Sequence, residues 1–234
     1  MILCLETSTT ICSVALCSNE GVVAVRESSE NKSHATRLTV FIQELFNVTG
    51  ISAGDLEAVA VSKGPGSYTG LRIGVSVAKG IAYAANIPLI GTETPFSMFY
   101  GISETVKMKY GTDSTSLFVP IIDARRMEVY YSIMDAGGKS VKEISAEIID
   151  ENSFLDIPGS VRMLFFGDGT EKCKSVLKRK NICFADEFII SASHMYIPAY
   201  GALREKRYED TAYFEPFYLK DFITSRPKKN ILGR

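Results

Sequence analysis

The chain has 234 residues, of which 46% are hydrophobic and 23% charged, with a formal net charge of −1 at pH 7. This balance is typical of a globular protein with a buried core, and it excludes a globally positive surface that would attract nucleic acid. No apolar run approaches the ~20 residues of a membrane span, and the first five residues lack the basic segment of a signal peptide. The five cysteines show no paired spacing, so we expect a cytoplasmic protein without a membrane partner.

The first half of the chain predicts short strands that alternate with helices. Apolar segments predict strands at residues 2–5, 10–17, 22–26, 59–62 and 88–91. A helix is expected after residue 33, with an apolar stripe that includes Leu38, Phe41 and Leu45. Further helices are expected over residues 68–85 and from 94 to about 105, the last with Pro95 in its first turn.

Residues 63–86 are the most distinctive stretch of this half. A Gly-Pro-Gly turn at 64–66 breaks regular structure, and Ser67 or Thr69 can cap the helix that follows. Small residues then recur every fourth position along that helix, at Gly70, Gly74, Ala78 and Ala82. Internal glycines cost about 1 kcal/mol each relative to alanine, so we expect another helix to pack closely on this ridge.

A phosphate site is the alternative interpretation of the same turn. Lys63 and Arg72 flank a glycine-rich segment at a helix N-terminus, where anions bind readily. The glycine spacing matches neither the dinucleotide fingerprint nor the Walker loop. The pattern therefore favours a structural turn and a packing helix.

The second half of the chain repeats the order of the first. Its predicted strands are residues 117–122, 129–134, 141–149, 163–166 and 182–184. A short helical piece is expected near 152–155, and helices over 170–178 and from about 193 to 205. Two βββαβα halves suggest an ancient duplication with lobes at 1–108 and 109–234. The last nine residues, 226–234, are expected to form a mobile basic tail.

Four motifs resemble one known family. They are LETSTT at residues 5–10, GPGSYTGLRIG at 64–74, DARRMEVY at 123–130 and EPFYLKDF at 215–222. The second is very similar to the signature of the bacterial TsaB (YeaZ) family, whose members are partners in making threonylcarbamoyladenosine in tRNA. The resemblance implies an α/β fold of two ribonuclease-H-like lobes, as in the actin, Hsp70 and sugar-kinase (ASKHA) superfamily.

The resemblance also indicates where a nucleotide would bind. In that superfamily the first hairpin turn carries an Asp and a Gly that meet magnesium and phosphate. Here Glu6, Thr7 and Ser8 offer a carboxylate and hydroxyls but no glycine, so the backbone cannot approach phosphate as closely. Gly167, Asp168 and Gly169 look like the matching turn of the second lobe, although any strand-to-helix turn needs such residues. We expect no cofactor and no ATP hydrolysis by the isolated chain, with residual ATP binding as the alternative.

Metal and peptidase chemistry are also not expected. The catalytic relatives, the TsaD subunits, hold a metal through an HxxxH pair, whereas here His34 is followed by Leu38 at the second position. His194, the only other histidine, has no paired ligand in sequence, and no activated nucleophile with a base can be assembled. His34 is expected to cap or pack at the start of its helix. Asp123 is expected to cap a hairpin end whose arginines are solvated.

Basic residues gather in two places that could contact phosphates. One run lies on a single predicted helix and the other in the tail: Lys172, Lys174, Lys178, Arg179 and Lys180, then Arg226, Lys228, Lys229 and Arg234. No aromatic RNA-binding motif accompanies them. A solvated face is therefore the default, and tRNA is expected to be contacted only within a larger complex.

The resemblance implies a non-enzymatic partner subunit that binds and stabilises the catalytic TsaD subunit together with the ATPase TsaE. The alternatives are an active ATP-dependent phosphotransferase or glycoprotease-like peptidase of the same fold, and a homodimeric scaffold unrelated to tRNA. Two helices are expected to form the docking surface and to pair with a second copy of the chain. Its predicted residues are Leu38, Phe41, Leu45, Gly70, Leu71, Gly74, Val75, Ala78 and Ala82. If the ridge packs inside the lobe instead, Leu71 and Val75 would make the contact.

Overall fold

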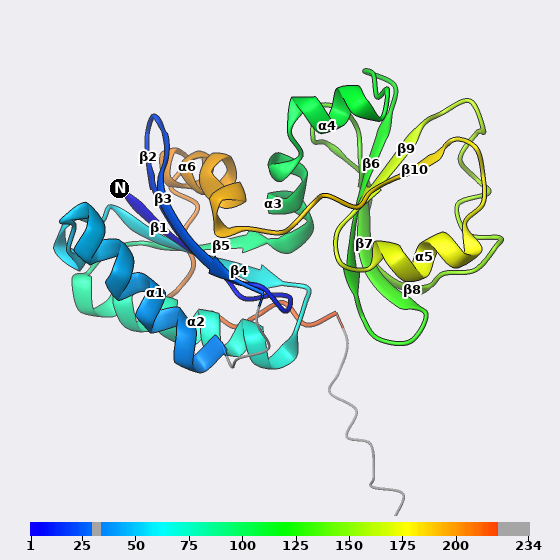
Figure 1. Ribbon diagram of the computed structural model, residues 1–234. Coiled ribbons are helices and arrows are strands. Elements are labelled where there is room, and N and C mark those ends of the chain that lie inside the picture. Colours follow the sequence, from blue (N-terminus) through cyan, green and yellow to red (C-terminus); the bar gives the residue numbers. More distant parts are fainter. Residues whose placement is uncertain (30–33, 220–234) are drawn as a thin grey trace, which may run out of the picture.

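A computed structural model describes residues 1–29 and 34–219 as two lobes, each built on its own sheet (Figure 1). The first half of the chain forms β1 (Ile2–Glu6), β2 (Cys12–Ser18), β3 (Gly21–Ser28), α1 (His34–Thr49), η1 (Ala53–Asp55), β4 (Ala58–Gly64), α2 (Tyr68–Ala85), β5 (Leu89–Glu93), α3 (Thr94–Gly101) and α4 (Glu104–Lys109). The second half forms β6 (Leu117–Asp123), β7 (Glu128–Met134), β8 (Ser140–Ile148), β9 (Met163–Phe166), α5 (Thr170–Val176), β10 (Ile182–Ala185), η2 (Ala192–Met195) and α6 (Tyr196–Arg204).

The two sheets share one topology. The strand order is β3-β2-β1-β4-β5 in the first and β8-β7-β6-β9-β10 in the second. In each sheet the first three strands form an antiparallel meander, the fourth strand pairs in parallel with the first, and the fifth pairs in parallel with the fourth. This order confirms the predicted α/β fold of two ribonuclease-H-like lobes.

Helices cover both faces of the first sheet. Leu3 and Leu5 pack with α1 and α2 on one face, whereas Ile2 and Cys4 pack with η2 and α6 on the other. Neighbouring strand residues point to opposite faces, and helices lie on both sides of this sheet (Figure 1), so these four side chains are all buried. The apolar run at the N-terminus is therefore a central strand buried on both sides.

The second sheet is also covered on both faces. Cys173 of α5 and Leu177, which directly follows α5, pack with Tyr131 and Phe165 on one face. The other face packs against α3, where Phe99 meets Phe118 edge to face with ring centroids 5.5 Å apart. Since α3 directly follows the last strand of the first sheet, it fastens the two lobes together.

Two predicted helices differ from the observed structure. The helix expected over 94–105 is broken at Ile102, whose ψ of 113° is extended, and a new helix starts where Ser103 Oγ accepts a hydrogen bond from Val106 N (3.2 Å). Residues 152–155 form turns and no helix, because Phe154 has a left-handed φ of 65°. Periodicity alone does not reveal such local backbone choices.

The C-terminal part of the described chain returns to the first lobe, although we expected residues 109–234 to belong to the second. The η2 and α6 residues pack on the first sheet. A C-terminal strap, defined as residues 209–218, follows: Glu209 N donates to Leu89 O (2.8 Å) and Phe217 N to Lys63 O (2.6 Å). The division at residue 108 into two domains stays a prediction, and the tail at 226–234 lies outside the described residues.

Within residues 1–29 and 34–219, no helix has both the length and the apolar character that crossing a membrane requires.

Candidate functional site

The glycine-rich turn joins β4 to α2 beside the end of β1. It contains a cis peptide bond between Gly64 and Pro65. Ser67 caps α2, because its Oγ accepts a hydrogen bond from Gly70 N (3.2 Å). Of the two cap residues considered from sequence, Ser67 is the one the structure uses.

The first two ridge positions, Gly70 and Gly74, pack on the turn after β1, which was not expected from the sequence. The expected helix neighbour is also present, because Gly70 lies close to His34 of α1, and Ala78 and Ala82 share a core cluster with α1 residues. A Cβ atom on Gly66 would lie 2.3 Å from Ser8 O, and one on Gly70 would lie 2.1 Å from Thr7 O. A Cβ on Gly74 would lie 2.3 Å from Thr7 Oγ1. Only glycine lets the start of α2 pass this close to the backbone of another segment. The glycines therefore bring α2 onto the candidate nucleotide turn.

The three candidate residues of that turn are buried beneath α2. Glu6 and Thr7 are 0% exposed and Ser8 is 1% exposed. Glu6 accepts hydrogen bonds from Ser8 N (2.6 Å) and from Ser62 Oγ. Burial raises the pKa of Glu6, these hydrogen bonds oppose the rise, and the negative charge of Asp168 adds to it. Thr7 Oγ1 and Ser8 Oγ have no hydrogen-bond partner among the described residues.

The matching turn of the second lobe lies between β9 and α5. Gly167 has a φ of 118°, and a Cβ there would lie 2.2 Å from Ile121 O. Asp168 Oδ1 accepts a hydrogen bond from Asp123 N (2.9 Å), while Gly169 N donates to Ile121 O (3.4 Å). Surrounding protein raises the pKa of Asp168 by desolvation, although part of the side chain stays exposed. Nucleotide binding at these two turns stays a prediction.

The structure agrees with the interpretation of Asp123 as the cap of a hairpin end. Its Oδ1 accepts a hydrogen bond from Arg125 N (2.6 Å), and Arg125 and Arg126 are exposed with left-handed φ values of 71° and 51°. Sequence reasoning missed that Lys172 Nζ lies 2.6 Å from Asp123 Oδ1. The two residues are 49 positions apart in sequence, and no local sequence pattern predicts a contact over that separation.

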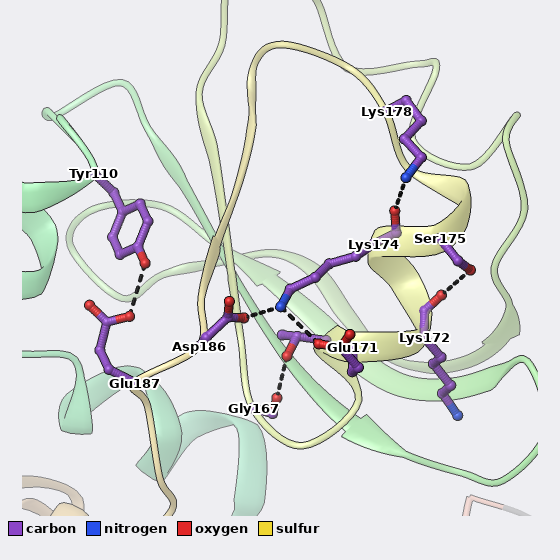
Figure 2. A network of polar contacts seen from close by, with 10 residues as sticks. Tyr110, Gly167, Glu171, Lys172, Lys174, Ser175, Lys178, Asp186 and Glu187 are labelled. Carbon is purple, nitrogen blue, oxygen red and sulfur yellow. Dashed lines mark hydrogen bonds and ion pairs between the residues drawn. The ribbon is translucent and has the colours of Figure 1, made fainter.

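The basic run on and after α5 is largely engaged in contacts within the protein. Figure 2 shows Lys174 Nζ between Glu171 (2.8 Å) and Asp186 (2.6 Å), and Lys178 Nζ donating to Lys174 O (2.7 Å). Arg179 donates to the carbonyl oxygens of Phe154 and Ile157. The side chains of Lys178 and Lys180 are exposed, which agrees with the expected solvated face. The second basic cluster, in the tail, lies outside the described residues.

The two cations beside the glycine turn also have partners. Lys63 Nζ lies 3.6 Å from Glu93 Oε1. The Arg72 guanidinium lies 4.1 Å from the centre of the Tyr68 ring, and its Nε donates to Tyr218 Oη (3.0 Å). These contacts agree with the structural interpretation of the turn.

Both histidines pack into the protein. His34 begins α1 and its Nε2 lies 2.9 Å from Thr9 O, which confirms its expected place at the start of the helix. His194 lies against the Phe188 ring, with centroids 5.3 Å apart, and burial lowers its pKa to about 4. Among the described residues, no group of three or more His, Cys, Asp and Glu side chains could hold a metal ion.

The structure corrects the residues expected on the docking surface. All nine are buried inside the first lobe: Leu38, Phe41, Leu45, Gly70, Leu71, Gly74, Val75, Ala78 and Ala82. An amphipathic helix packs its apolar stripe against the core of its own lobe. The small-residue ridge and the alternative contact residues Leu71 and Val75 both lie on that buried stripe. We define the outer face of α1 and α2 by five of their solvent-exposed residues: Val40, Val48, Ser76, Gly80 and Tyr83.

Comparisons with known proteins cover both lobes. The family model described as "TsaD: tRNA N6-adenosine threonylcarbamoyltransferase" matches residues 21–226. The chain is 28% identical over 231 residues to the tRNA threonylcarbamoyladenosine biosynthesis protein TsaB of Escherichia coli K12, covering 95% of each chain. It is 31% identical over 154 residues to the protein of the same name from Bacillus subtilis 168, covering 66% of this chain and 62% of that one.

The fold is shared with a solved structure from Pseudomonas aeruginosa, described as an uncharacterized protein with similarity to peptidase YEAZ. The TM-score is 0.76 at 22% sequence identity, and the match covers 94% of this chain and 99% of that chain.

Proposed function

Because this chain belongs to the TsaB (YeaZ) family of glycoprotease-like proteins, we propose that it serves threonylcarbamoyladenosine biosynthesis in tRNA as a non-catalytic partner subunit. Its partners in this proposal are the transferase subunit TsaD and the ATPase TsaE. The Escherichia coli relative is named for this biosynthesis. The matched family model is described as that of the transferase itself, which suits a paralogue that binds the enzyme.

The observation that carries the proposal is the burial of the turn after β1. Glu6, Thr7 and Ser8 are buried under the glycine-rich turn and the start of α2, which pass so close that a Cβ on Gly66 would lie 2.3 Å from Ser8 O and one on Gly70 2.1 Å from Thr7 O. A nucleotide-hydrolysing site needs backbone donors and a carboxylate that the substrate can reach. This arrangement supports a subunit that uses the superfamily fold for binding a partner.

The outer face of α1 and α2 is the docking surface in this proposal. Tyr83 is 84% exposed and Val48 is 63% exposed, while Ser76 and Gly80 let another backbone approach. Tyrosine is frequent at protein interfaces, and exposed apolar side chains mark them. A two-fold axis makes such a surface self-complementary, so a homodimer would use the face that TsaD needs. Contact with tRNA would arise within the complex.

Reconstitution tests the proposal directly. The chain is combined with its own TsaD and TsaE, tRNA, ATP and a preformed threonylcarbamoyl-adenylate. Threonylcarbamoyladenosine should form only when the chain is present. The double variant Val40→Glu with Tyr83→Glu should weaken binding to TsaD by at least about tenfold, which is 1.4 kcal/mol. Ile148→Glu, an equally drastic change at an exposed residue of the second lobe, should leave binding unchanged.

The enzyme alternative has its own measurement. An active phosphotransferase or peptidase should turn over with the isolated chain, and ordinary enzymes reach rates on the order of 1 per second or faster. Hydrolysis of magnesium-ATP at such a rate by the pure chain, abolished by Glu6→Gln, would contradict the proposed non-catalytic role.

A further inference from the structure

A cavity of about 250 Å³ lies between the two lobes. Residues of β5, α3 and α6 line it from the first lobe, and residues of β7 and β8 line it from the second. None of the six candidate nucleotide residues is among its lining residues. The cavity is therefore separate from the two turns described above, and its size suits a small metabolite better than a nucleotide.

Two hydroxyl groups are buried in its wall. Thr92 on β5 is 4% exposed and Ser132 on β7 is 2% exposed. Neither Thr92 Oγ1 nor Ser132 Oγ has a hydrogen-bond partner among the residues that the structure describes. Proteins rarely leave buried polar groups unsatisfied, because losing water without gaining a partner is unfavourable. The two hydroxyls come from different lobes and line the same space.

Charges of both signs stand around the same cavity. Lys63 and Arg207 supply positive charge, and Glu93 and Glu143 supply negative charge. Arg207 Nε also lies 2.5 Å from Glu205 Oε2, which leaves the other guanidinium N–H groups for a ligand. Lys63 Nζ and Glu93 Oε1 are 3.6 Å apart, which is longer than a hydrogen bond, so each can still bind a ligand. Apolar side chains complete the wall, Phe96 and Met134 among them. Apolar walls with a few convergent polar groups are typical of small-molecule sites.

We propose that this cavity binds a small zwitterion of the α-amino-acid type. Its carboxylate would face Lys63 and Arg207, its ammonium group would face Glu93 and Glu143, and its apolar part would lie against Phe96 and Met134. The hydroxyls of Thr92 and Ser132 would gain the hydrogen bonds that they lack. A phosphorylated ligand would bring a double negative charge next to the two glutamates, and a simple cation would meet Lys63 and Arg207. A zwitterion suits both pairs.

Calorimetry on the full chain tests this inference, and it does so without TsaD, TsaE or tRNA. Each of the standard free L-amino acids is titrated separately, and at least one should bind one-to-one with a Kd tighter than about 1 mM. The N-acetyl and amide derivatives of that amino acid, which each lack one charge, should bind at least about tenfold more weakly. The site is formed by both lobes and exists only in the folded chain. Binding should therefore also raise the melting temperature.

Three nearly isosteric variants locate the site. Thr92→Val and Ser132→Ala should each weaken binding by about tenfold, while the unliganded chain keeps or gains stability. Thr94→Val is the matched control: Thr94 Oγ1 is also buried without a partner among the described residues, but Thr94 does not line the cavity. The inference is overturned if no amino acid binds, if a singly charged derivative binds as tightly as the parent, or if Thr94→Val has the same effect as Thr92→Val.

Discussion

At the residue scale, His194 is an acid-sensitive group in the core. Its ring is packed between Phe188 and Gly101 and accepts a hydrogen bond from Ser191 N (3.3 Å). Burial lowers its pKa from 6.5 to about 4. Between pH 6.5 and pH 4, His194 therefore binds a proton more readily in the unfolded chain than in the folded chain. The free energy of unfolding falls as the pH is lowered through this range.

We expect His194 to account for a loss of up to about 3 kcal/mol between pH 6.5 and pH 4. Urea unfolding at several pH values measures this for the wild type and for His194→Gln, which should lose stability less steeply on acidification. Phe188→Leu is the packing control, because it removes the stacked ring and keeps the titrating group. A slope in His194→Gln equal to that of the wild type would contradict the assignment.

Two glycines of α2 provide a second residue-scale prediction. A Cβ added to Gly74 would lie 2.3 Å from Thr7 Oγ1, whereas a Cβ added to Gly80 would have no atom within 4 Å. Gly74→Ala should therefore destabilise the protein by about 1–3 kcal/mol through overpacking. Gly80→Ala should stabilise it by about 0.5–1 kcal/mol, because alanine favours the helix and loses less entropy on folding. Thermal unfolding of the pair checks both signs, and equal shifts would mean that the close approach at Gly74 is unimportant.

At the element scale, the C-terminal strap is held to α2 by side chains as well as by backbone bonds. Lys79 Nζ donates to the carbonyl oxygens of Ala212 (3.1 Å) and Phe214 (3.0 Å). At the other end, the Tyr68 and Tyr218 rings lie 5.0 Å apart and Arg72 bonds to Tyr218 Oη. The strap therefore has two separate attachments along one helix.

Tyr218→Ala should release the far end of the strap and leave the near end attached. Stacking and the hydrogen bond to Arg72 together contribute about 1–2 kcal/mol, so hydrogen exchange should accelerate at residues 215–218 with little change in global stability. The control is Tyr213→Ala, since Tyr213 is an exposed tyrosine of the same strap. If exchange at 215–218 is the same in both variants, the ring cluster does not hold the strap.

At the scale of the whole molecule, the two lobes should unfold as one unit. Phe99 of α3 packs on Phe118 of the second sheet, and the strap and α6 bind the second half of the chain to the first lobe. Calorimetry of the wild type should show one transition with equal calorimetric and van't Hoff enthalpies. Phe99→Ala should cost about 3–5 kcal/mol and separate the transitions of the lobes, whereas Phe99→Leu should keep them together. Two transitions in the wild type would refute this coupling.

The sequence predicted the architecture better than it predicted surfaces. Apolar periodicity was sufficient for the ten strands of the two sheets and their repeated order, because each strand has a consistent local pattern. The ridge at Gly70 and Gly74 was also recognised as a close contact, but its partner, the turn at Thr7, is distant in sequence. For the same reason, the docking residues expected on α1 and α2 are the ones that their own lobe buries. Contacts between distant segments need the structure.

The return of η2 and α6 to the first sheet has a consequence for the chain as it leaves the ribosome. Ile2, Cys4, Ala58, Ala60 and Ile90 line a face of the first sheet that packs against residues 192–203. At a synthesis rate of about 5–20 residues per second, this apolar face stays exposed for on the order of ten seconds before η2 and α6 have been synthesised. Nascent chains of this protein should therefore need a chaperone until the last helix emerges, and a fragment ending near residue 108 should aggregate on release.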